Sequence, residues 1–146
     1  MASLTSTLKS PAELQAWGRR LAKLLKPGDI VALVGDLGAG KTMLVQSIAK
    51  AWGYKRGASS PTFALANEYE TPRGTIYHMD MYRLTPPELA TFPLEEYLNQ
   101  GLCLIEWADR VQDRLPKTCW KIRFSIPAPD RRVLRLSKPS KSRARI

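Results

Sequence analysis

The feature that most constrains this chain is a glycine-rich stretch, GDLGAGKT, at residues 35–42. It fills every fixed position of the pattern G-x-x-x-x-G-K-[ST], in which backbone amides and a lysine surround phosphate oxygens. A short apolar run, 29–34, precedes it, and helical spacing from Thr42 to Trp52 follows it. Because the pattern carries this meaning only between a buried strand and a helix, the sequence predicts a phosphate-binding loop in an α/β fold.

Each residue of this loop has an expected role. The glycines allow successive backbone N–H groups to turn toward phosphate oxygens. Lys41 can reach the β- and γ-phosphates, and the Thr42 hydroxyl can contact Mg²⁺ at the N-terminus of the following helix. The ligands indicated are a nucleoside triphosphate and Mg²⁺. The backbone positions expected around the phosphates are Gly35, Asp36, Leu37, Gly38, Ala39 and Gly40.

A nucleoside triphosphatase also needs an acid on the metal side, usually at the end of a neighbouring apolar strand. Glu106 ends the apolar run 102–105 and is one candidate. Asp80 lies in the segment YHMDMYR, 77–83, and is the other. The residues alone leave the choice open.

The sequence does not favour a zinc site. His78 is the only histidine, and a lone histidine is more often a hydrogen-bonded structural residue than a ligand. Cys103 and Cys119 form no CxxC pair, and Cys103 lies inside an apolar run. We expect both cysteines to be buried free thiols.

Periodicity and turn signals give the remaining elements. Ser10, Pro11 and Glu13 predict a helix start with a capping box. Two hairpins are expected, one around the turn 71–74 and one around the turn 127–130. The fold predicted is a three-layer α/β P-loop fold with a mainly parallel central sheet plus antiparallel hairpins. Helices are expected over 11–25, 42–52 and 86–99, and strands over 29–34, 63–70, 75–82, 102–105, 120–126 and about 134–136.

Length and charge bound the organisation. The chain has 146 residues, of which 44% are apolar, enough for one packed domain, expected over 1–137. Residues 1–116 carry 13 Lys/Arg and 12 Asp/Glu, whereas 117–146 carry 10 and 1. Residues 138–146 are expected to be a basic tail that is disordered without a partner. The absence of long apolar runs and of signal features argues against a membrane protein and predicts a cytoplasmic location.

Five short motifs in order carry a resemblance to a known family. The sequence resembles the TsaE family, formerly called YjeE, the small P-loop ATPases of bacterial tRNA threonylcarbamoyladenosine synthesis. The resemblance spans roughly residues 10–136. The motifs are GDLGAGKT at 35–42, SPTF at 60–63, EY at 68–69, YHMDMYRL at 77–84 and IEW at 105–107.

This resemblance implies an auxiliary ATPase that binds ATP and Mg²⁺ and acts with the TsaB and TsaD proteins. Its pathway places a threonylcarbamoyl group on adenosine 37 of tRNAs reading codons that begin with A, and tRNA is expected to be engaged indirectly through the complex. The roles implied are Mg²⁺ binding by Thr42 and Glu106, a functional acid at Asp80, and a γ-phosphate switch at Ser60, Pro61 and Thr62. Arg131 occupies a place where the family commonly contacts nucleotide.

Two other functions stay open at this stage. A small-molecule or nucleoside kinase uses the same loop but needs an acceptor pocket and usually an arginine-bearing lid. A nucleotide-gated tRNA-binding module would take most of its binding energy from phosphate contacts by the tail. An arginine finger adds about 10³ to 10⁵ to the rate of phosphoryl transfer. Turnover by the ATPase is therefore expected to be slow while the site awaits a partner. Whether Arg83 or a partner supplies that charge is also open.

Overall fold

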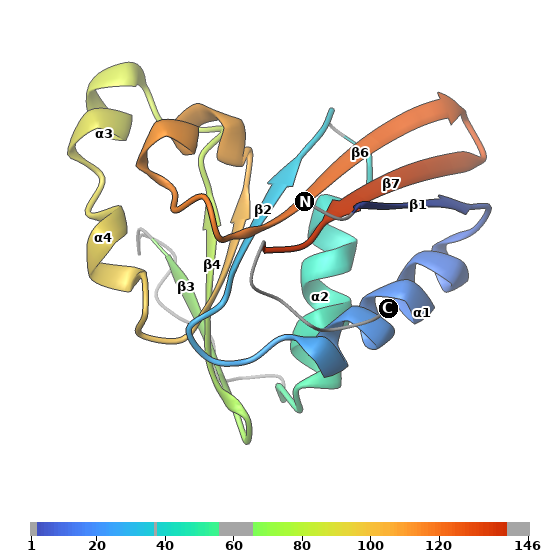
Figure 1. Cartoon of the computed structure of the whole chain (residues 1–146), viewed down its shortest axis with the longest axis horizontal. Helices are drawn as coiled ribbons and strands as arrows, with labels where there is room; N and C mark the ends of the chain where they lie inside the picture. The colour runs from blue at the N-terminus through green and yellow to red at the C-terminus, as the bar shows by residue number, and fades with distance from the viewer. Residues whose placement is uncertain (1–2, 37, 56–65, 140–146) are drawn as a thin grey trace.

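The computed structural model describes residues 3–36, 38–55 and 66–139, and every element below lies within these ranges (Figure 1). The strands are β1 Ser3–Leu8, β2 Ile30–Val34, β3 Asn67–Thr71, β4 Gly74–Asp80, β5 Leu102–Glu106, β6 Trp120–Ala128 and β7 Arg131–Ser137. The α-helices are α1 Pro11–Leu24, α2 Lys41–Ala51, α3 Pro86–Thr91 and α4 Leu94–Tyr97, and η1 Ala108–Arg114 is a 3₁₀ helix.

The strands form one sheet in the order β1-β7-β6-β2-β5-β4-β3. The pairs β6–β2, β2–β5 and β5–β4 are parallel, and the pairs toward both edges are antiparallel. The predicted fold class, a mainly parallel central sheet with appended hairpins, is therefore confirmed. Both hairpins form, with β3 and β4 joined across the turn Thr71 to Gly74 and β6 followed directly by β7.

Helices cover the sheet on two sides, which gives three layers (Figure 1). Helices α1 and α2 pack on one face through a core that includes Trp17, Leu44 and Trp52, each 1% exposed or less. On the other face, Leu94 of α4, Val111 of η1 and Phe92, which lies between α3 and α4, contribute to a second core. Strands β2 and β5 are buried along their whole length because both cores contact them.

The predicted start of the first helix is confirmed in most details. The Ser10 hydroxyl accepts a hydrogen bond from the Glu13 backbone N–H at 3.2 Å, and Pro11 is the first helical residue. The Glu13 carboxylate, however, accepts from the Lys9 backbone N–H at 2.9 Å, not from that of Ser10. Both interactions satisfy N–H groups that have no partner within the helix.

The structure differs from the sequence-based expectation in three places. Strand β1 and the 3₁₀ helix η1 were not predicted. The helical region expected over 86–99 is two short helices, because the chain becomes extended at Phe92 before Pro93. Of the strand expected over 63–70, the described part is β3, and residues 63–65 lie outside the described ranges, as does most of the expected tail, 140–146.

No helix in the described ranges combines the length and the apolar character needed to cross a bilayer.

Candidate nucleotide-binding site

The candidate site lies where three parallel strands end side by side. The glycine-rich loop follows β2, Glu106 is the last residue of β5, and Asp80 is the last residue of β4. Asp80 and Glu106 are direct register partners. The carboxyl ends of parallel strands are the usual place for ligands in open α/β sheets. Pairing of the strands thus brings together residues far apart in sequence.

Two loop glycines are fixed by close packing as well as by backbone conformation. A Cβ on Gly35 would lie 2.7 Å from Cβ of Phe124 and 2.9 Å from its carbonyl oxygen. A Cβ on Gly40 would lie 2.7 Å from a Leu14 methyl carbon, and Gly40 also has a φ of 105°. Strand β6 and helix α1 therefore hold the loop against the sheet at the two ends of the glycine pattern.

Lys41 is buried beneath the loop, with 4% of its surface exposed. Its ammonium donates hydrogen bonds to the carbonyl oxygens of Gly35 and Asp36, the latter at 2.8 Å. The same Nζ lies 4.5 Å from the centroid of the Trp107 ring. Burial lowers the pKa of Lys41, and the negative charge of Glu106 opposes part of that effect. Lys41 is thus positioned at the loop, where a bound phosphate group would compete with the Gly35 and Asp36 carbonyl oxygens for hydrogen bonds from the ammonium.

A chain of hydrogen bonds runs from the helix start to the edge hairpin. The Thr42 hydroxyl lies 3.1 Å from each oxygen of the Glu106 carboxylate. His78 Nε2 is 2.6 Å from Glu106 Oε2, and His78 Nδ1 is 2.9 Å from the Tyr69 hydroxyl. An Nε2–H that donates to the carboxylate leaves Nδ1 as the acceptor for the phenol O–H. His78 therefore orients Glu106 toward Thr42.

The residues at this point fit a magnesium ion. Mg²⁺ prefers hard oxygen ligands, and it usually takes one or two from the protein while phosphates and water supply the others. Thr42 offers a hydroxyl oxygen and Glu106 a carboxylate that is 4% exposed, and the two groups already lie together. Within the described ranges no group of three or more His, Cys, Asp or Glu side chains is arranged as a metal cage.

Between Glu106 and the loop is a hollow of about 410 Å³, which we call the metal-side hollow. Asp80 lines it, and the Asp80 carboxylate also accepts a hydrogen bond from the Tyr82 backbone N–H at 2.9 Å. Arg83 lines the same hollow. The Tyr82 and Trp107 rings, with centroids 4.7 Å apart, form a wall beside Lys41. The structure brings Lys41, Thr42, Asp80 and Glu106 to one place.

A second hollow, of about 320 Å³, lies on the other side of Gly38 and Gly40, and we call it the base-side hollow. Leu8 and Leu14 line one wall, and the turn between β6 and β7 lines another. Arg132 approaches the loop here, with its Nη2 3.2 Å from the Gly38 carbonyl oxygen. The predicted contact residue, Arg131, is exposed and does not line this hollow. Its role remains a prediction, and Arg132 is the arginine that the structure places at the loop.

Four of the predicted site residues lie outside the described ranges. They are Leu37 of the loop and the expected switch residues Ser60, Pro61 and Thr62.

Reasoning from the sequence missed the roles of His78, Tyr69 and Arg132. His78 and Tyr69 become neighbours of Glu106 only through the pairing of β3, β4 and β5. The period-two alternation places His78 and Asp80 on one face of β4, which was the available signal. Nothing in the sequence distinguishes Arg132 from Arg131, since the turn geometry decides which one points toward the loop.

A strand, a glycine-rich loop and a helix in this order, with an acid at the end of the adjacent parallel strand, define the P-loop class of α/β proteins. The comparisons with known proteins narrow that class. A family model described as "Threonylcarbamoyl adenosine biosynthesis protein TsaE" matches residues 8–133.

Curated relatives and a solved structure agree with the family model. A Bacillus subtilis tRNA threonylcarbamoyladenosine biosynthesis protein TsaE is 39% identical over 126 residues, 86% of this chain and 79% of the relative. The Rickettsia bellii TsaE is 37% identical over 139 residues, 94% and 96% of the two chains. A crystal structure of Bacillus subtilis YdiB matches with a TM-score of 0.80 and 32% identity, over 95% of this chain and 87% of that one. This chain belongs to the TsaE family of tRNA threonylcarbamoyladenosine biosynthesis.

Proposed function

We propose that the chain is an auxiliary ATPase that binds Mg-ATP, hydrolyses it slowly, and acts with TsaB and TsaD in the threonylcarbamoylation of adenosine 37 of tRNA. The observation that carries this proposal is the convergence of Lys41, Thr42 and Glu106 at one end of the metal-side hollow. These are a phosphate-binding cation, a metal-binding hydroxyl and a metal-binding acid, which together are the groups that phosphoryl transfer requires.

The two hollows suggest how the nucleotide lies. Phosphates bound by the loop would place the γ-phosphate and metal beside Thr42 and Glu106, in the metal-side hollow. The base and ribose would then occupy the base-side hollow, on the far side of Gly38 and Gly40. Its apolar wall at Leu8 and Leu14 suits a base, and the Arg132 guanidinium suits the ribose and phosphates.

Each residue would do a separate part of the work. Lys41 would neutralise phosphate oxygens as charge develops in the transition state. Thr42 and Glu106 would hold the metal, which supplies charge stabilisation at the transferring phosphoryl group when bound. His78 would keep the Glu106 carboxylate aimed at Thr42. Asp80, which lines the same hollow as Glu106, would serve as a polar wall group next to the metal.

The proposal is tested by measuring ATP hydrolysis by the chain alone, with the TsaB and TsaD proteins, and with tRNA added. We expect slow turnover alone and faster turnover with the protein partners. Turnover that rises with a small-molecule acceptor but not with the partners would indicate a kinase instead. Turnover that ignores the proteins and responds only to tRNA would favour a nucleotide-gated RNA-binding module.

A nucleotide-dependent switch is a separate part of the proposal. Contacts to a γ-phosphate can order a segment that relaxes after hydrolysis. Affinity for the TsaB–TsaD complex is therefore expected to differ between the ATP and ADP states, as measured by calorimetry. Equal affinities would remove the switch role assigned to residues 60–62, because a ligand without differential affinity shifts no equilibrium.

A further inference from the structure

Among the residues that the structure describes, no helix covers one face of the sheet over β1, β7 and β6. Inward residues of these strands, such as Leu8, Phe124 and Leu134, pack with α1 and α2. The alternate residues of the same strands, such as Thr5, Arg123 and Arg135, point to the other side of the sheet and are exposed. The 3₁₀ helix η1 on that side packs on β2, beyond the edge of β6. We call this surface the open face.

The register of the three strands arranges the open face in rows. Ser3 pairs with Ser137, which pairs with Lys121. The next row is Thr5, Arg135 and Arg123, and the third is Thr7, Val133 and Ser125. Each row thus combines hydroxyl groups with cations or a single apolar side chain.

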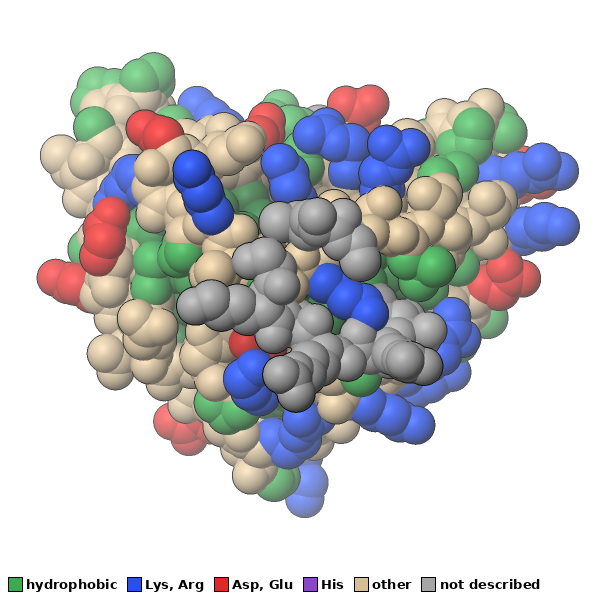
Figure 2. Space-filling model, viewed as in Figure 1, with side chains coloured by type: hydrophobic (Ala, Val, Ile, Leu, Met, Phe, Trp, Pro, Cys, Tyr) green, Lys and Arg blue, Asp and Glu red, His purple; other side chains and the backbone are tan. Residues whose placement is uncertain are grey.

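The charge of these strands has one sign. Together β1, β6 and β7 contain five Lys or Arg and no Asp or Glu. Four of the five, Lys121, Arg123, Arg131 and Arg135, share the parity of the open face. Figure 2 shows Lys and Arg side chains gathered along the upper part of the molecule, over β6.

Two of these cations face each other directly. Arg123 and Arg135 are cross-strand partners, an arrangement in which like charges destabilise a sheet. Among the described residues, ion pairs form at Lys26–Asp29, His78–Glu106 and Arg114–Glu95, all away from this face. In the described part of the chain, therefore, no ion pair with a carboxylate offsets the repulsion between Arg123 and Arg135. An external anion would offset it.

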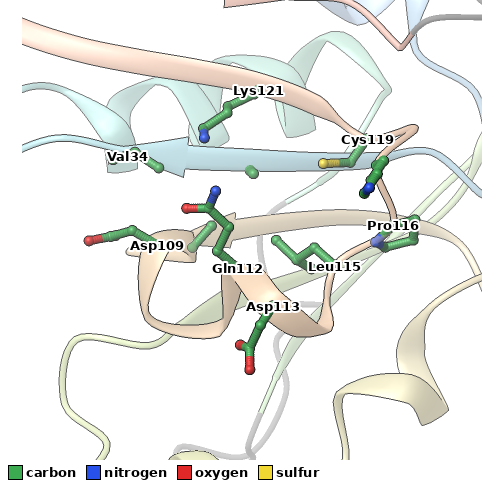
Figure 3. Close-up of a pocket in the computed structure, with 11 residues that line it drawn as sticks. Val34, Asp109, Gln112, Asp113, Leu115, Pro116, Cys119 and Lys121 are labelled. Carbon is green, nitrogen blue, oxygen red and sulfur yellow. The ribbon is translucent and has the colours of Figure 1, made fainter.

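The open face continues into a groove beside β6. This groove, of about 780 Å³, runs between η1 and β6 over β2, on the opposite side of the sheet from α2. Lys121 extends from β6 toward Gln112 of η1 across it (Figure 3). Asp109 and Asp113 line the η1 wall. The cationic surface thus has a defined border at Lys121, where the acidic residues of η1 begin.

We propose that the open face binds the ribose-phosphate backbone of RNA. Arginine and lysine side chains neutralise phosphates, and serine and threonine hydroxyls donate to phosphate oxygens, which are the common protein contacts to a nucleic-acid backbone. Cations at alternate positions of a strand, such as Lys121 and Arg123, stand about 7 Å apart and can contact successive phosphates. Without aromatic side chains for base stacking, the face binds shape and charge and not sequence.

The composition favours RNA over an acidic protein. Protein interfaces usually centre on aromatic or other large apolar side chains surrounded by a polar rim. The three rows of the open face contain one apolar residue, Val133. The inference goes beyond the proposed ATPase function, because the open face lies on the side of the sheet away from α2, whereas Lys41 and Thr42 begin α2.

The test compares two double variants of the full chain that remove the same charge. Arg123→Gln with Arg135→Gln alters the open face, and Arg20→Gln with Lys23→Gln alters exposed positions of α1 on the other side. Fluorescence anisotropy with an unmodified tRNA transcript gives the affinity across a series of KCl concentrations. Thermal unfolding and ATP hydrolysis without partners are measured for both variants as controls on fold and site.

We expect the open-face variant to bind tRNA about tenfold more weakly at low salt, with the slope of log affinity against log salt reduced by about 1.4 to 1.8, since each phosphate contact contributes about 0.7 to 0.9. The α1 variant should keep the native slope. Equal slopes for the two variants would overturn the proposal. Polyglutamate serves as a second probe. If the open-face variant lost binding to polyglutamate but bound tRNA as the native chain does, the proposal would be overturned and the face assigned to an acidic protein. Because ATP hydrolysis is measured separately, failure here leaves the proposed ATPase function testable.

Discussion

The two halves of the sheet differ in how many faces are covered. Strands β2 and β5 are buried along their whole length between two cores, whereas the described residues cover β6, β7 and β1 on one face only. Of the catalytic candidates, Glu106 is the last residue of β5, and Lys41 begins the helix that follows β2 across the glycine-rich loop. The cations Arg123 and Arg135 lie on the singly covered ones.

The difference shows what burial permits. In the doubly covered half a polar side chain is kept only where it has hydrogen-bond partners, as Glu106 has in Thr42 and His78. In the singly covered half the outward positions are released from packing, and their chemistry is set by solvent or by whatever binds there. The first half therefore carries a precise site, and the second a surface.

The largest expected effect is on stability. Leu33 of β2 is fully buried, and Leu33→Ala should lower the free energy of unfolding by about 2–5 kcal/mol, because it removes packing and leaves a cavity. Thr5→Ala on the open face should change it by less than about 0.5 kcal/mol. Urea denaturation of both variants measures the two values. Similar losses would contradict the division of the sheet into two halves.

The next effect is on catalysis. Lys41→Ala should lower ATP turnover by about 100-fold or more, since it removes a charge aimed at the transition state. Lys50→Ala, an exposed lysine in the last turn of the same helix, is the matched control and should turn over normally.

Glu106→Gln and Thr42→Ala should behave differently from Lys41→Ala, because these two residues position the metal and do not neutralise phosphate directly. Steady-state hydrolysis measured over a range of Mg²⁺ concentrations distinguishes these two variants from Lys41→Ala. Glu106→Gln is expected to keep nucleotide binding and lose metal-dependent hydrolysis. Normal hydrolysis by Glu106→Gln would transfer the metal-side role to Asp80.

A smaller effect is expected at His78, which contacts Glu106 but does not line the metal-side hollow. His78→Gln should raise the Mg²⁺ concentration needed for half-maximal nucleotide binding by about tenfold, a typical loss for a residue that orients a metal ligand. Excess Mg²⁺ should restore binding. Tyr69→Phe, one step further along the chain of hydrogen bonds, should cause a smaller shift. An unchanged Mg²⁺ midpoint in His78→Gln would show that the histidine is structural only.

The smallest effect concerns the two thiols, of which Cys103 is buried in β5 and Cys119 is partly exposed at the groove beside β6. Burial raises the pKa of Cys103 in β5 to about 12, and it raises the pKa of the partly buried Cys119 as well. Because the thiolate is the reactive form, Cys103 in the folded chain should react with iodoacetamide much more slowly than in urea. Cys119, at the groove, should react faster than Cys103. Mass spectrometry after timed alkylation gives both rates, and faster labelling of Cys103 would contradict its full burial.

Local patterns predicted most of the central fold. Strands β2 and β5 are continuous apolar runs, and the helix α2 follows the loop at helical spacing. Strand β1, SLTSTL, was not predicted because only Leu4 and Leu8 in it are apolar. It pairs with β7, which is far from it in sequence, so no local signal marks the pairing. Segment η1 was not predicted because it consists of two short 3₁₀ turns separated at Val111, where φ is −128°, and such turns lack the 3.6-residue period.

The site residues that could be predicted are those marked by a local sequence pattern. Lys41 and Thr42 follow from the loop pattern, and Glu106 follows from its place at the end of an apolar strand. The orienting role of His78 depends on the register of β4 against β5, which pairs His78 with Leu104 and Asp80 with Glu106. Turn geometry fixes the register of a hairpin, but β4 and β5 are parallel and joined by no tight turn, so no short segment shows how they pair.

The central claim is that Thr42 and Glu106 form a magnesium site for a nucleotide bound by the loop. Calorimetric titration of ATP into the native chain and into Glu106→Gln, each with and without Mg²⁺, tests it most directly. We expect Mg²⁺ to strengthen ATP binding to the native chain and to have little effect on Glu106→Gln, while the two chains bind metal-free ATP similarly. Equal strengthening by Mg²⁺ in both chains would contradict the claim.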